Sequence, residues 1–231
     1  MADMIYNRQQ SLNLRIPAQA SIIGCGGVGA WVAIDLAMTG VPRLNLFDDD
    51  NLEMHNINRI PFTPGDVGLQ KTEIVSDFIT GIRPEISIVR YGKLSEITGS
   101  LIGGVVIDCT DRIATQSLVQ ALCKQKKLPY YRVGYDGNHL TVIDGQHEDA
   151  PKAVEVWDDG SGQEGYTVVP SWVVPPQVGA ALVTYMVCTD RAFEPIITQM
   201  EDLTLIDSLK RALSAAQKEV TDRGKKKARK R

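Results

Sequence analysis

A glycine-rich turn between an apolar run and a helical pattern is the feature that most constrains this chain. The apolar residues 20–23 lead into Gly24, Gly26 and Gly29, spaced G-x-G-x-x-G, and the helical pattern that follows ends at Gly40. In such a motif the first glycine permits a tight turn, the second lets the backbone approach a phosphate, and the third lets the helix pack on the strand. Free N–H groups at the helix start also attract an anionic phosphate. We therefore expect a strand, a turn and a helix that together bind a nucleotide.

An acidic cluster follows the next apolar stretch. Residues 44–47 form a second predicted strand, and Asp48, Asp49 and Asp50 come directly after it. Asp48 stands nineteen residues beyond Gly29, at a strand end where an acid can hold the ribose hydroxyls of a nucleotide. These residues leave the kind of nucleotide open.

The hydrophobic periodicity along the rest of the chain predicts an α/β fold. We expect strands at residues 20–23, 44–47, 85–91, 103–109, 128–134 and 140–144. We expect helices at residues 28–37, 67–82, 112–127, 176–189 and 196–218. Together these elements predict a Rossmann-like, mainly parallel central sheet with helices on both faces, extended by antiparallel strands over about 130–156.

Composition and charge favour a soluble cytoplasmic protein with one main domain. The chain has 231 residues, of which 43% are hydrophobic and 23% charged, as in ordinary globular domains. No apolar run is long enough for a membrane span, and no signal-peptide pattern opens the chain. The four cysteines are scattered without a C-x-x-C pair, which argues against a disulfide framework and fits a reducing compartment.

The last fourteen residues differ in charge from the rest. Residues 218–231 hold eight Lys or Arg against two acids, a net charge of +6, so the remainder carries −9 because the whole chain carries −3. We expect a single domain over residues 1–217 and a disordered basic tail over 218–231. Contact with nucleic acid is expected only through this tail.

Polar residues also follow the acidic cluster, on the side of the sheet where such folds bind ligands. Asn56, Asn58 and Arg59 lie in this loop, and a guanidinium there can contact a phosphate through two hydrogen bonds. Lys71 falls in the first turns of the helix predicted at 67–82, for which Asp66 is the expected N-cap. By itself Lys71 is typical of a solvated helix face.

Two further aspartates follow the fourth predicted strand. Asp108 ends that strand, and Asp111 precedes the next helix. Asp111 has the position of a helix N-cap. Beside the phosphates of a nucleotide, the same carboxylate can instead hold magnesium.

Five ordered blocks of this chain, together with its start, resemble the ThiF/MoeB family of adenylyltransferases, the catalytic relatives of ubiquitin-activating enzymes. The likeness covers residues 6–145 well and 166–189 loosely. The matching blocks are Gly24-Cys25-Gly26-Gly27-Val28-Gly29, Asp48-Asp49-Asp50, His55-Asn56-Ile57-Asn58-Arg59-Ile60, Asp66-Val67-Gly68-Leu69-Gln70-Lys71 and Asp108-Cys109-Thr110-Asp111-Arg112, with Tyr6-Asn7-Arg8-Gln9-Gln10 at the start.

The resemblance implies an enzyme that uses ATP and Mg²⁺ to adenylate the C-terminal carboxylate of a ubiquitin-like or sulfur-carrier protein or a peptide ending in glycine, with release of pyrophosphate. Asp111 is implied to position the magnesium, and Arg8 to reach into the site of a neighbouring subunit in a homodimer. The resemblance also implies that Arg59 and Lys71 act in catalysis together with Asp111 and Arg8. The nucleotide is implied to contact Gly24, Gly26, Gly27, Gly29, Asp48, Asp50, Asn56, Arg59 and Lys71.

The chain also departs from the family pattern. His55, Ile60 and Arg112 stand where the family has Ser, Gln and Asn. The paired C-x-x-C motifs of many relatives are missing, so we expect no structural zinc. The region 146–174, which corresponds to the family's crossover loop, contains no cysteine, and Cys188 lies in a buried helix pattern. A thioester or persulfide intermediate is therefore not expected.

Three other functions stay open from the sequence. One is a family member that activates a carboxylate on a non-protein substrate, such as a modified tRNA nucleoside. Another is an NAD-dependent oxidoreductase, which shares the glycine fingerprint but needs neither the Arg59 nor the Lys71 block. The last is a nonenzymatic, nucleotide-binding partner subunit that keeps the fold.

Overall fold

The computed structural model describes residues 5–95, 97–147, 150, 171–189 and 194–200. Contacts divide the chain into two compact units, Met1–Ile197 and Thr198–Arg231. The description below concerns the first unit together with the strand Ile196–Gln199, which crosses the boundary. The basic tail, and the domain boundary predicted at residue 217, lie outside the described residues and stay predictions.

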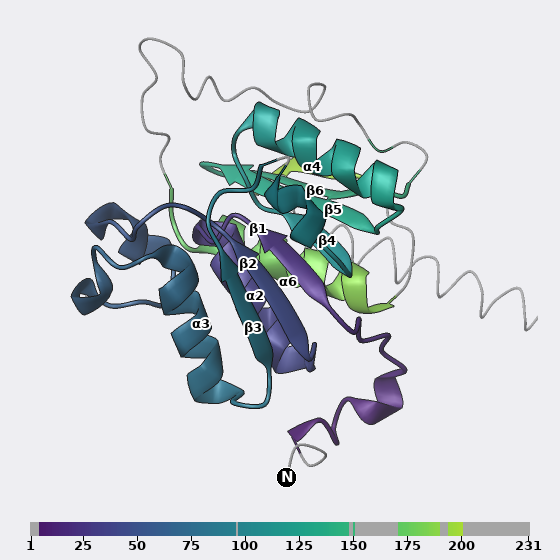
Figure 1. Ribbon diagram of the computed structural model, residues 1–231, viewed down its shortest axis with the longest axis horizontal. Coiled ribbons are helices and arrows are strands. Elements are labelled where there is room, and N and C mark those ends of the chain that lie inside the picture. Colours follow the sequence, from purple (N-terminus) through teal and green to yellow (C-terminus); the bar gives the residue numbers. More distant parts are fainter. Residues whose placement is uncertain (1–4, 96, 148–149, 151–170, 190–193, 201–231) are drawn as a thin grey trace, which may run out of the picture. The chain divides into compact units, whose positions relative to one another are not determined.

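A seven-stranded sheet organises the fold, with the strand order β3-β2-β1-β4-β5-β6-β7 (Figure 1). Neighbouring strands from β3 to β5 pair in parallel, and β6 pairs antiparallel with β5. The strands are β1 Ala20–Ile23, β2 Arg43–Phe47, β3 Ser87–Tyr91, β4 Val105–Asp108, β5 Tyr130–Asp136, β6 His139–Asp144 and β7 Ile196–Gln199. The predicted mainly parallel sheet with an antiparallel extension is confirmed.

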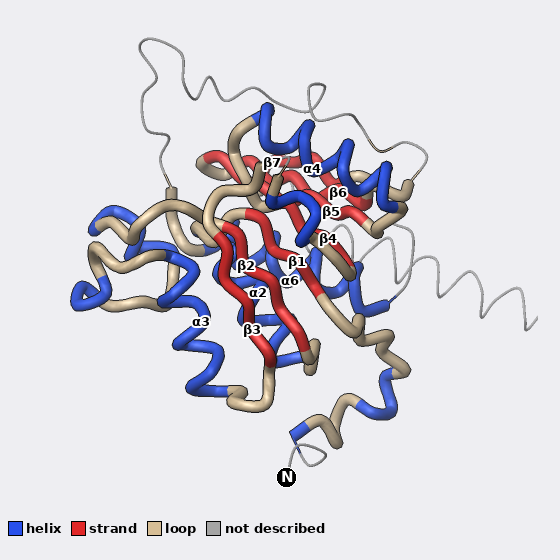
Figure 2. The backbone as a smooth tube through the Cα atoms, viewed as in Figure 1, coloured by secondary structure: helices blue, strands red, loops and turns tan. Residues whose placement is uncertain are grey.

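Helices cover both faces of this sheet, as predicted. The helix α2 packs on β1, on α3 and on α6, which also contacts β5 and β6, whereas α4 packs on the opposite face of the sheet against β4 (Figure 2). The α-helices are α2 Gly27–Thr39, α3 Lys71–Ile82, α4 Ile113–Lys126 and α6 Val174–Thr189. The described residues also contain four short 3₁₀ helices: η1 Gln10–Leu12, η2 Met54–Arg59, η3 Pro64–Asp66 and η4 Thr98–Leu101.

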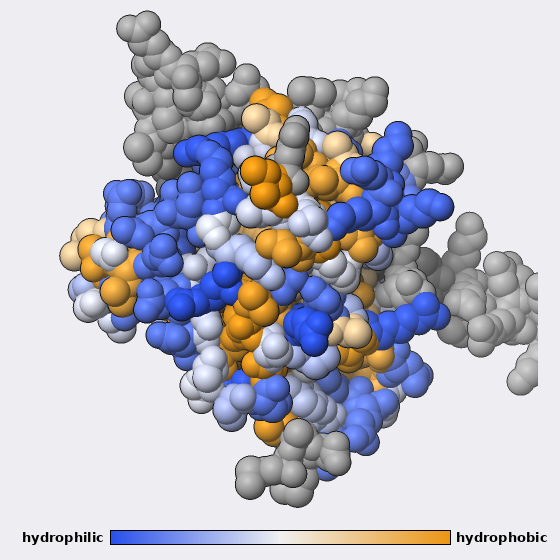
Figure 3. Space-filling view, viewed as in Figure 1, coloured by the Kyte–Doolittle hydropathy of each residue, from blue (hydrophilic) through white to orange (hydrophobic). Residues whose placement is uncertain are grey.

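The central strands are fully buried and the edge strand is not. Every residue of β1 and β4 is buried, whereas β3 has only half-buried and exposed residues, and Val89 on it is 40% exposed. Parallel strands that are covered on both faces read as continuous apolar runs, which is why β1 and β4 were predictable. On the face in view, hydrophobic surface is interrupted by hydrophilic surface (Figure 3). Within the described residues, no helix combines the length and the hydrophobicity that a membrane span requires.

The helix predicted at 67–82 begins later than expected. Gly68 has φ +94°, a left-handed conformation that a helix cannot continue through, and the backbone of residues 68–69 pairs with Leu52 instead. Asp66 accepts a hydrogen bond from the backbone N–H of Thr63 at 2.8 Å and so caps η3 rather than α3. Lys71 is therefore the first residue of α3.

The prediction of a helix over 196–218 is wrong at its start. Residues 196–199 form β7, in keeping with the β-branched side chains of Ile196, Ile197 and Thr198, which favour strands. The remainder of that predicted helix lies outside the described residues.

The start of the described chain is held against the ends of two helices. The ring of Tyr6 lies against Gly40 at the end of α2, and the guanidinium carbon of Arg83 lies 5.9 Å from its centroid. Gln9 donates a side-chain hydrogen bond of 2.7 Å to the carbonyl of Thr39. These contacts of Tyr6 and Gln9 anchor the N-terminal segment to α2 and to the end of α3.

Gly29 shows how closely α2 approaches β1. A Cβ atom there would lie 1.8 Å from the carbonyl oxygen of Gly24. We expect Gly29→Ala to lower the free energy of unfolding by about 1–3 kcal/mol or more, the usual cost of overpacking. Urea denaturation measures this change.

A matched control for this substitution is Gly81→Ala. Gly81 lies in α3 and a Cβ there meets nothing within 4 Å, so alanine should stabilise the helix by up to about 1 kcal/mol. Equal unfolding free energies of the two variants would contradict the packing argument.

Candidate active site

A cavity of about 470 Å³ opens at the carboxyl ends of the central strands. The strand order reverses between β1 and β4, and α/β sheets bind ligands at this kind of position. The volume falls in the range of small-molecule pockets. Its wall contains every predicted site residue except Gly29 and Arg8, namely Gly24, Gly26, Gly27, Asp48, Asp50, Asn56, Arg59, Lys71 and Asp111.

Gly24 and Gly29 have the local structure that the spacing predicted, and the phosphate contact expected at Gly26 stays a prediction. Gly24 turns the chain with φ +87°, and Gly29 is the point of closest approach between α2 and β1. Gly26 precedes the first residue of α2 and faces open space, because a Cβ there would meet no atom within 4 Å. The start of α2 therefore presents bare backbone to the cavity, as a phosphate-binding turn requires.

Asp48 is tied to this turn. Its carboxylate accepts hydrogen bonds from the backbone N–H of Cys25 at 2.6 Å and of Asp50 at 2.8 Å. Burial raises the pKa of Asp48, against the opposing effects of the Lys71 charge and of the two N–H groups. The acid that was predicted to hold a ribose thus also fixes the position of the glycine turn.

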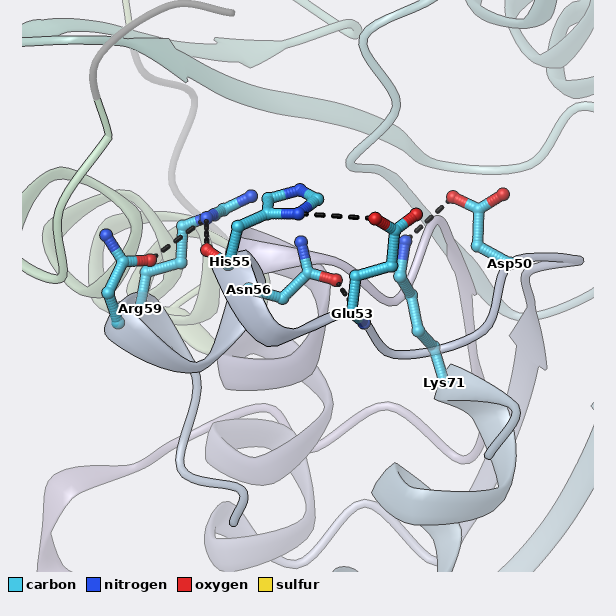
Figure 4. A network of polar contacts seen from close by, with 7 residues as sticks. Asp50, Glu53, His55, Asn56, Arg59 and Lys71 are labelled. Carbon is cyan, nitrogen blue, oxygen red and sulfur yellow. Dashed lines mark hydrogen bonds and ion pairs between the residues drawn. The ribbon is translucent and has the colours of Figure 1, made fainter. Parts of the chain in front are cut away.

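The 3₁₀ helix η2 arranges the residues of the Asn-x-x-Arg block (Figure 4). Asn56 is 9% exposed, and its side-chain oxygen accepts a 2.9 Å hydrogen bond from the backbone N–H of Glu53, which caps η2. Arg59 donates to the carbonyl of His55 at 2.7 Å and to the side chain of Asn58 at 3.0 Å. These bonds hold one guanidinium nitrogen of Arg59 and direct the group toward the cavity that it lines.

Lys71 and Asp50 form an ion pair across the cavity wall. Their Nζ and Oδ2 atoms are 2.7 Å apart, and the Lys71 side chain is only 13% exposed. A cation with so little water around it is strongly attracted to further anions. The first residue of α3 is therefore part of the site and not the solvated helix face that a single lysine suggests.

Asp111 and Asp108 have different environments. Asp111 is exposed and lines the cavity, and its carboxylate makes no hydrogen bond or ion pair within the part of the chain that the structure describes. Arg112 is the N-cap residue of α4, so Asp111 does not cap this helix. Asp108 is fully buried and accepts hydrogen bonds from the backbone and hydroxyl of Thr110 and from the hydroxyl of Tyr130.

Arg8 is exposed and does not line the cavity of its own chain. It lies on the N-terminal segment that Tyr6 anchors to the ends of α2 and α3. The predicted role of Arg8 in a neighbouring subunit is not tested by a single chain and stays a prediction.

Several cavity residues were missed in the sequence. Arg132 is one, although an arginine in the apolar strand pattern L-P-Y-Y-R-V-G could have marked it. Ser171 is another: its carbonyl accepts from Asn58 at 2.7 Å, and its hydroxyl bonds the Tyr135 hydroxyl at 2.6 Å. Ser171 thus links η2 to β5, a contact between distant segments that no local pattern indicates. Further missed residues of the wall are Asp49, His55, Lys93, Thr110, Arg112, Thr115, Gln116 and Thr141.

The cysteines of the described chain are poorly suited to nucleophilic chemistry. Burial raises the pKa of Cys25 and Cys109 well above the ordinary thiol value, and that of Cys188 to about 11. Thiolates are the reactive form of cysteine. Cys188 is 3% exposed in α6, in agreement with the predicted core position. The region 151–170 of the expected crossover loop lies outside the described residues.

Known proteins resemble this chain in both sequence and structure. The model of the ThiF family matches residues 6–174, a range that includes every site residue named above.

The chain belongs to the ThiF family.

Curated relatives of this ThiF-family chain have different names. Ubiquitin-like modifier-activating enzyme 5 of Drosophila pseudoobscura pseudoobscura is 33% identical over 137 residues, covering 52% of this chain and 34% of that protein. The tRNA threonylcarbamoyladenosine dehydratase of Haemophilus influenzae is 32% identical over 157 residues, covering 65% and 60%. The sulfur carrier protein ThiS adenylyltransferase of Escherichia coli is 31% identical over 150 residues, covering 61% and 58%. The chain thus spans between 34% and 60% of the length of these relatives.

Solved structures share the fold of this ThiF-family chain. The crystal structure of E. coli MccB aligns with a TM-score of 0.63 at 20% identity, covering 79% of this chain and 62% of that chain. The structure of TcdA (CsdL) aligns with a TM-score of 0.60 at 21% identity, covering 73% and 84%. These likenesses confirm the predicted fold class.

The buried Asp108 gives a pH-dependent prediction. Burial raises the pKa of its carboxyl to about 6, with partial compensation by Thr110, Arg132 and Tyr130. Because the folded pKa is above the unfolded one, wild-type stability is lost as the pH rises through about 6. Asp108→Asn removes this titration, so we expect the variant to gain stability relative to wild type between pH 4.5 and pH 7.5.

The upper limit of that relative gain is about 3 kcal/mol, since each tenfold change in proton affinity is worth about 1.4 kcal/mol. Urea unfolding of both proteins at the two pH values measures it. A stability difference between variant and wild type that is the same at both values would show that Asp108 does not titrate in this range.

Proposed function

We propose that this chain is an ATP-dependent adenylyltransferase that activates the C-terminal carboxylate of a ubiquitin-like or sulfur-carrier protein, or of a peptide. Membership of the ThiF family supports this, as do relatives named as a ubiquitin-like modifier-activating enzyme and a ThiS adenylyltransferase. The observation that carries the proposal is the convergence of five separate sequence blocks on one cavity. These blocks supply the bare turn at Gly26, Asp48, the Arg59 and Lys71 cations, and Asp111.

The proposed chemistry accounts for this combination of groups. An anionic carboxylate must approach an anionic α-phosphate, and pyrophosphate must leave with additional negative charge. Arg59, Lys71 and the N–H groups at the start of α2 are fixed donors on one side of the cavity, where they can offset this charge without reorganisation of solvent. Asp48 is placed by its bonds to Cys25 and Asp50 to hold the ribose.

The residues present also fit a magnesium ion. Asp111 offers an exposed carboxylate with no other partner among the described residues, and it lines the same cavity as Arg59 and Lys71. Carboxylate oxygens are the ligands that Mg²⁺ takes beside phosphates. When bound, the metal would neutralise phosphate charge.

We further propose that the chain works as a homodimer to which Arg8 contributes in trans. Arg8 is exposed and is not among the residues that line the cavity of its own chain, which favours a role outside its own subunit. Tyr6 and Gln9 hold the segment that carries it on the surface.

A second candidate is activation of a carboxylate on a modified tRNA nucleoside. It is favoured by one observation, the match to a tRNA threonylcarbamoyladenosine dehydratase over 65% of the chain. That share is larger than the 52% matched by the ubiquitin-like modifier-activating enzyme. The two candidates share the adenylation step and differ only in the acyl substrate.

ATP–pyrophosphate exchange in the presence of candidate small proteins ending in Gly-Gly separates these possibilities. Exchange that depends on one such protein supports the first candidate. Exchange only with tRNA supports the second. Binding of NAD but not ATP would favour an oxidoreductase, and ATP binding without any exchange a nonenzymatic partner subunit.

Lys71→Ala is expected to lower the exchange rate by about 100- to 1000-fold, because it removes a fixed cation that offsets transition-state charge. The control is Lys124→Ala, which removes an exposed lysine of α4 that does not line the cavity. Urea unfolding shows whether either variant is destabilised. An unchanged rate for folded Lys71→Ala would return this lysine to a structural role.

Hybrid dimers test the proposal for Arg8. Arg8→Ala and Asp111→Ala chains should each be inactive alone. After subunit exchange, the mixture should recover about a quarter of wild-type exchange activity, because half of the dimers are hybrid and each has one intact site. No recovery, with exchange of subunits proven by mixed affinity tags, would show that Arg8 does not act in trans.

A further inference from the structure

Arg132 is a buried cation in the wall of the cavity, and neither the family likeness nor the proposed roles use it. It lies on β5 in register with Asp108 of β4 and is only 5% exposed, yet it lines the cavity. A guanidinium has five N–H donors and is always charged. Its N–H donors and its positive charge therefore need partners in the protein, the solvent or a ligand.

The protein supplies hydrogen-bond partners for only some of the N–H groups of Arg132. One of its nitrogens donates a 3.2 Å hydrogen bond to the side-chain oxygen of Gln116 on α4. Gln116 is itself held, because its amide nitrogen donates to the carbonyl of Thr110 at 2.7 Å. Gln116 thus orients the guanidinium, but an amide oxygen does not neutralise its charge.

No carboxylate of the described chain forms an ion pair with Arg132. Asp108 is the nearest acid in register, and the charge of Arg132 does lower its pKa, though less than burial raises it. The oxygens of Asp108 are already bonded to Thr110 and Tyr130. Asp136 is four residues further along β5, roughly 13 Å away in strand geometry.

Arg132 makes one hydrogen bond and no ion pair within the described chain, and none of its nitrogens is buried without a partner, so its other N–H groups are open to the cavity. A charged group with so little exposure gains from a ligand that supplies a counter-ion. The guanidinium fork matches a carboxylate, which it can bind through two parallel hydrogen bonds. Arg112, at the N-cap of α4, adds a second cation to the same wall. The wall formed by α4 and β5 is therefore suited to an anionic group.

This wall is separate from the part of the cavity that the nucleotide would take. Arg132 pairs in register with Asp108, which pairs with Ile23, so its Cα lies two strand spacings, roughly 10 Å, from the end of β1. The turn that follows β1 is the proposed phosphate site. The second substrate must share the cavity, and the side near Arg132 is the part left for it.

We propose that Arg132 binds a carboxylate of the acyl substrate other than the one that is adenylated, and so selects substrates with a second acidic group close to the activated end. The proposal rests on the proposed adenylation function and names the substrate class of that same site. The activated carboxylate is a poor partner for Arg132, because it loses its charge when it becomes an acyl-adenylate. Two hydrogen bonds from the guanidinium would also occupy the oxygen lone pairs with which the activated carboxylate attacks the α-phosphate.

Stable mimics of acyl-adenylates test this without knowledge of the natural substrate. The probes are 5′-O-sulfamoyladenosines whose acyl group is malonyl, succinyl or glutaryl, each paired with the analogue in which the free carboxylate is a carboxamide. Isothermal titration calorimetry measures their affinities. For at least one chain length, we expect the acid to bind about 10- to 100-fold more tightly than its amide, the usual value of a charged hydrogen bond.

Variants assign that preference to Arg132. Arg132→Gln should abolish it and leave ATP affinity unchanged, whereas Arg132→Lys, which keeps the charge, should retain part of it. Arg90→Gln is the matched control: this arginine pairs with Glu73 at 3.7 Å outside the cavity and should keep the full preference. If Arg132→Gln fails to fold, the wild-type comparison and Arg132→Lys still decide the matter.

The outcomes separate the two proposals. Equal binding of each acid and its amide by wild type would overturn the role of Arg132 and leave adenylation standing. If Arg132→Gln still binds the acids more tightly than their amides, the role of Arg132 is overturned and adenylation again stands. An equal loss of affinity for ATP and all analogues in Arg132→Gln would make Arg132 a nucleotide ligand. If wild type binds neither ATP nor any analogue, the proposed function fails and this inference with it.

Discussion

The close approach of α2 to β1 is the constraint on which the rest of the site depends. With no side chain at Gly29, the helix packs directly on the carbonyl of Gly24. This contact fixes the start of α2 at the floor of the cavity and keeps the backbone of Gly26 open to it. Asp48 then locks the turn from the neighbouring strand by accepting the N–H of Cys25. The backbone N–H groups at this turn are held rigidly, because they belong to two elements that pack directly on each other.

The cavity groups its charges in a way that matches two anionic substrates. Arg59 and Lys71 stand beside the glycine turn, while Arg132 and Arg112 lie on the wall formed by β5 and α4. Acidic groups line the same cavity: Asp48 is bound to the turn, and Asp111 has no partner among the described residues. The ion pair of Lys71 with Asp50 keeps one cation in place before a nucleotide arrives. Such preorganised charge is what a reaction between a carboxylate and a phosphate requires.

Much of the fold could be predicted because its core strands are buried on both faces and its glycines carry a distinctive spacing. Nearly all predicted site residues of the nucleotide half also meet in one cavity, since parallel strands bring the loops after them to one edge. The errors have physical causes. Gly68 in a left-handed conformation delays α3, and the β-branched residues after Pro195 form a strand rather than a helix. Arg132 and Ser171 were missed because their roles depend on contacts between distant segments, which a local pattern does not contain.

Binding of ATP at the start of α2 can be measured by amide NMR spectroscopy of the isotope-labelled protein. Titration with ATP and Mg²⁺ should shift the backbone amide signals of residues 25–28, and those of Thr110 and Asp111 across the cavity. The amides of β3 at the sheet edge should change little. Saturable shifts at this turn would support the account. Shifts confined to another surface, or no saturable shift at millimolar ATP, would contradict it.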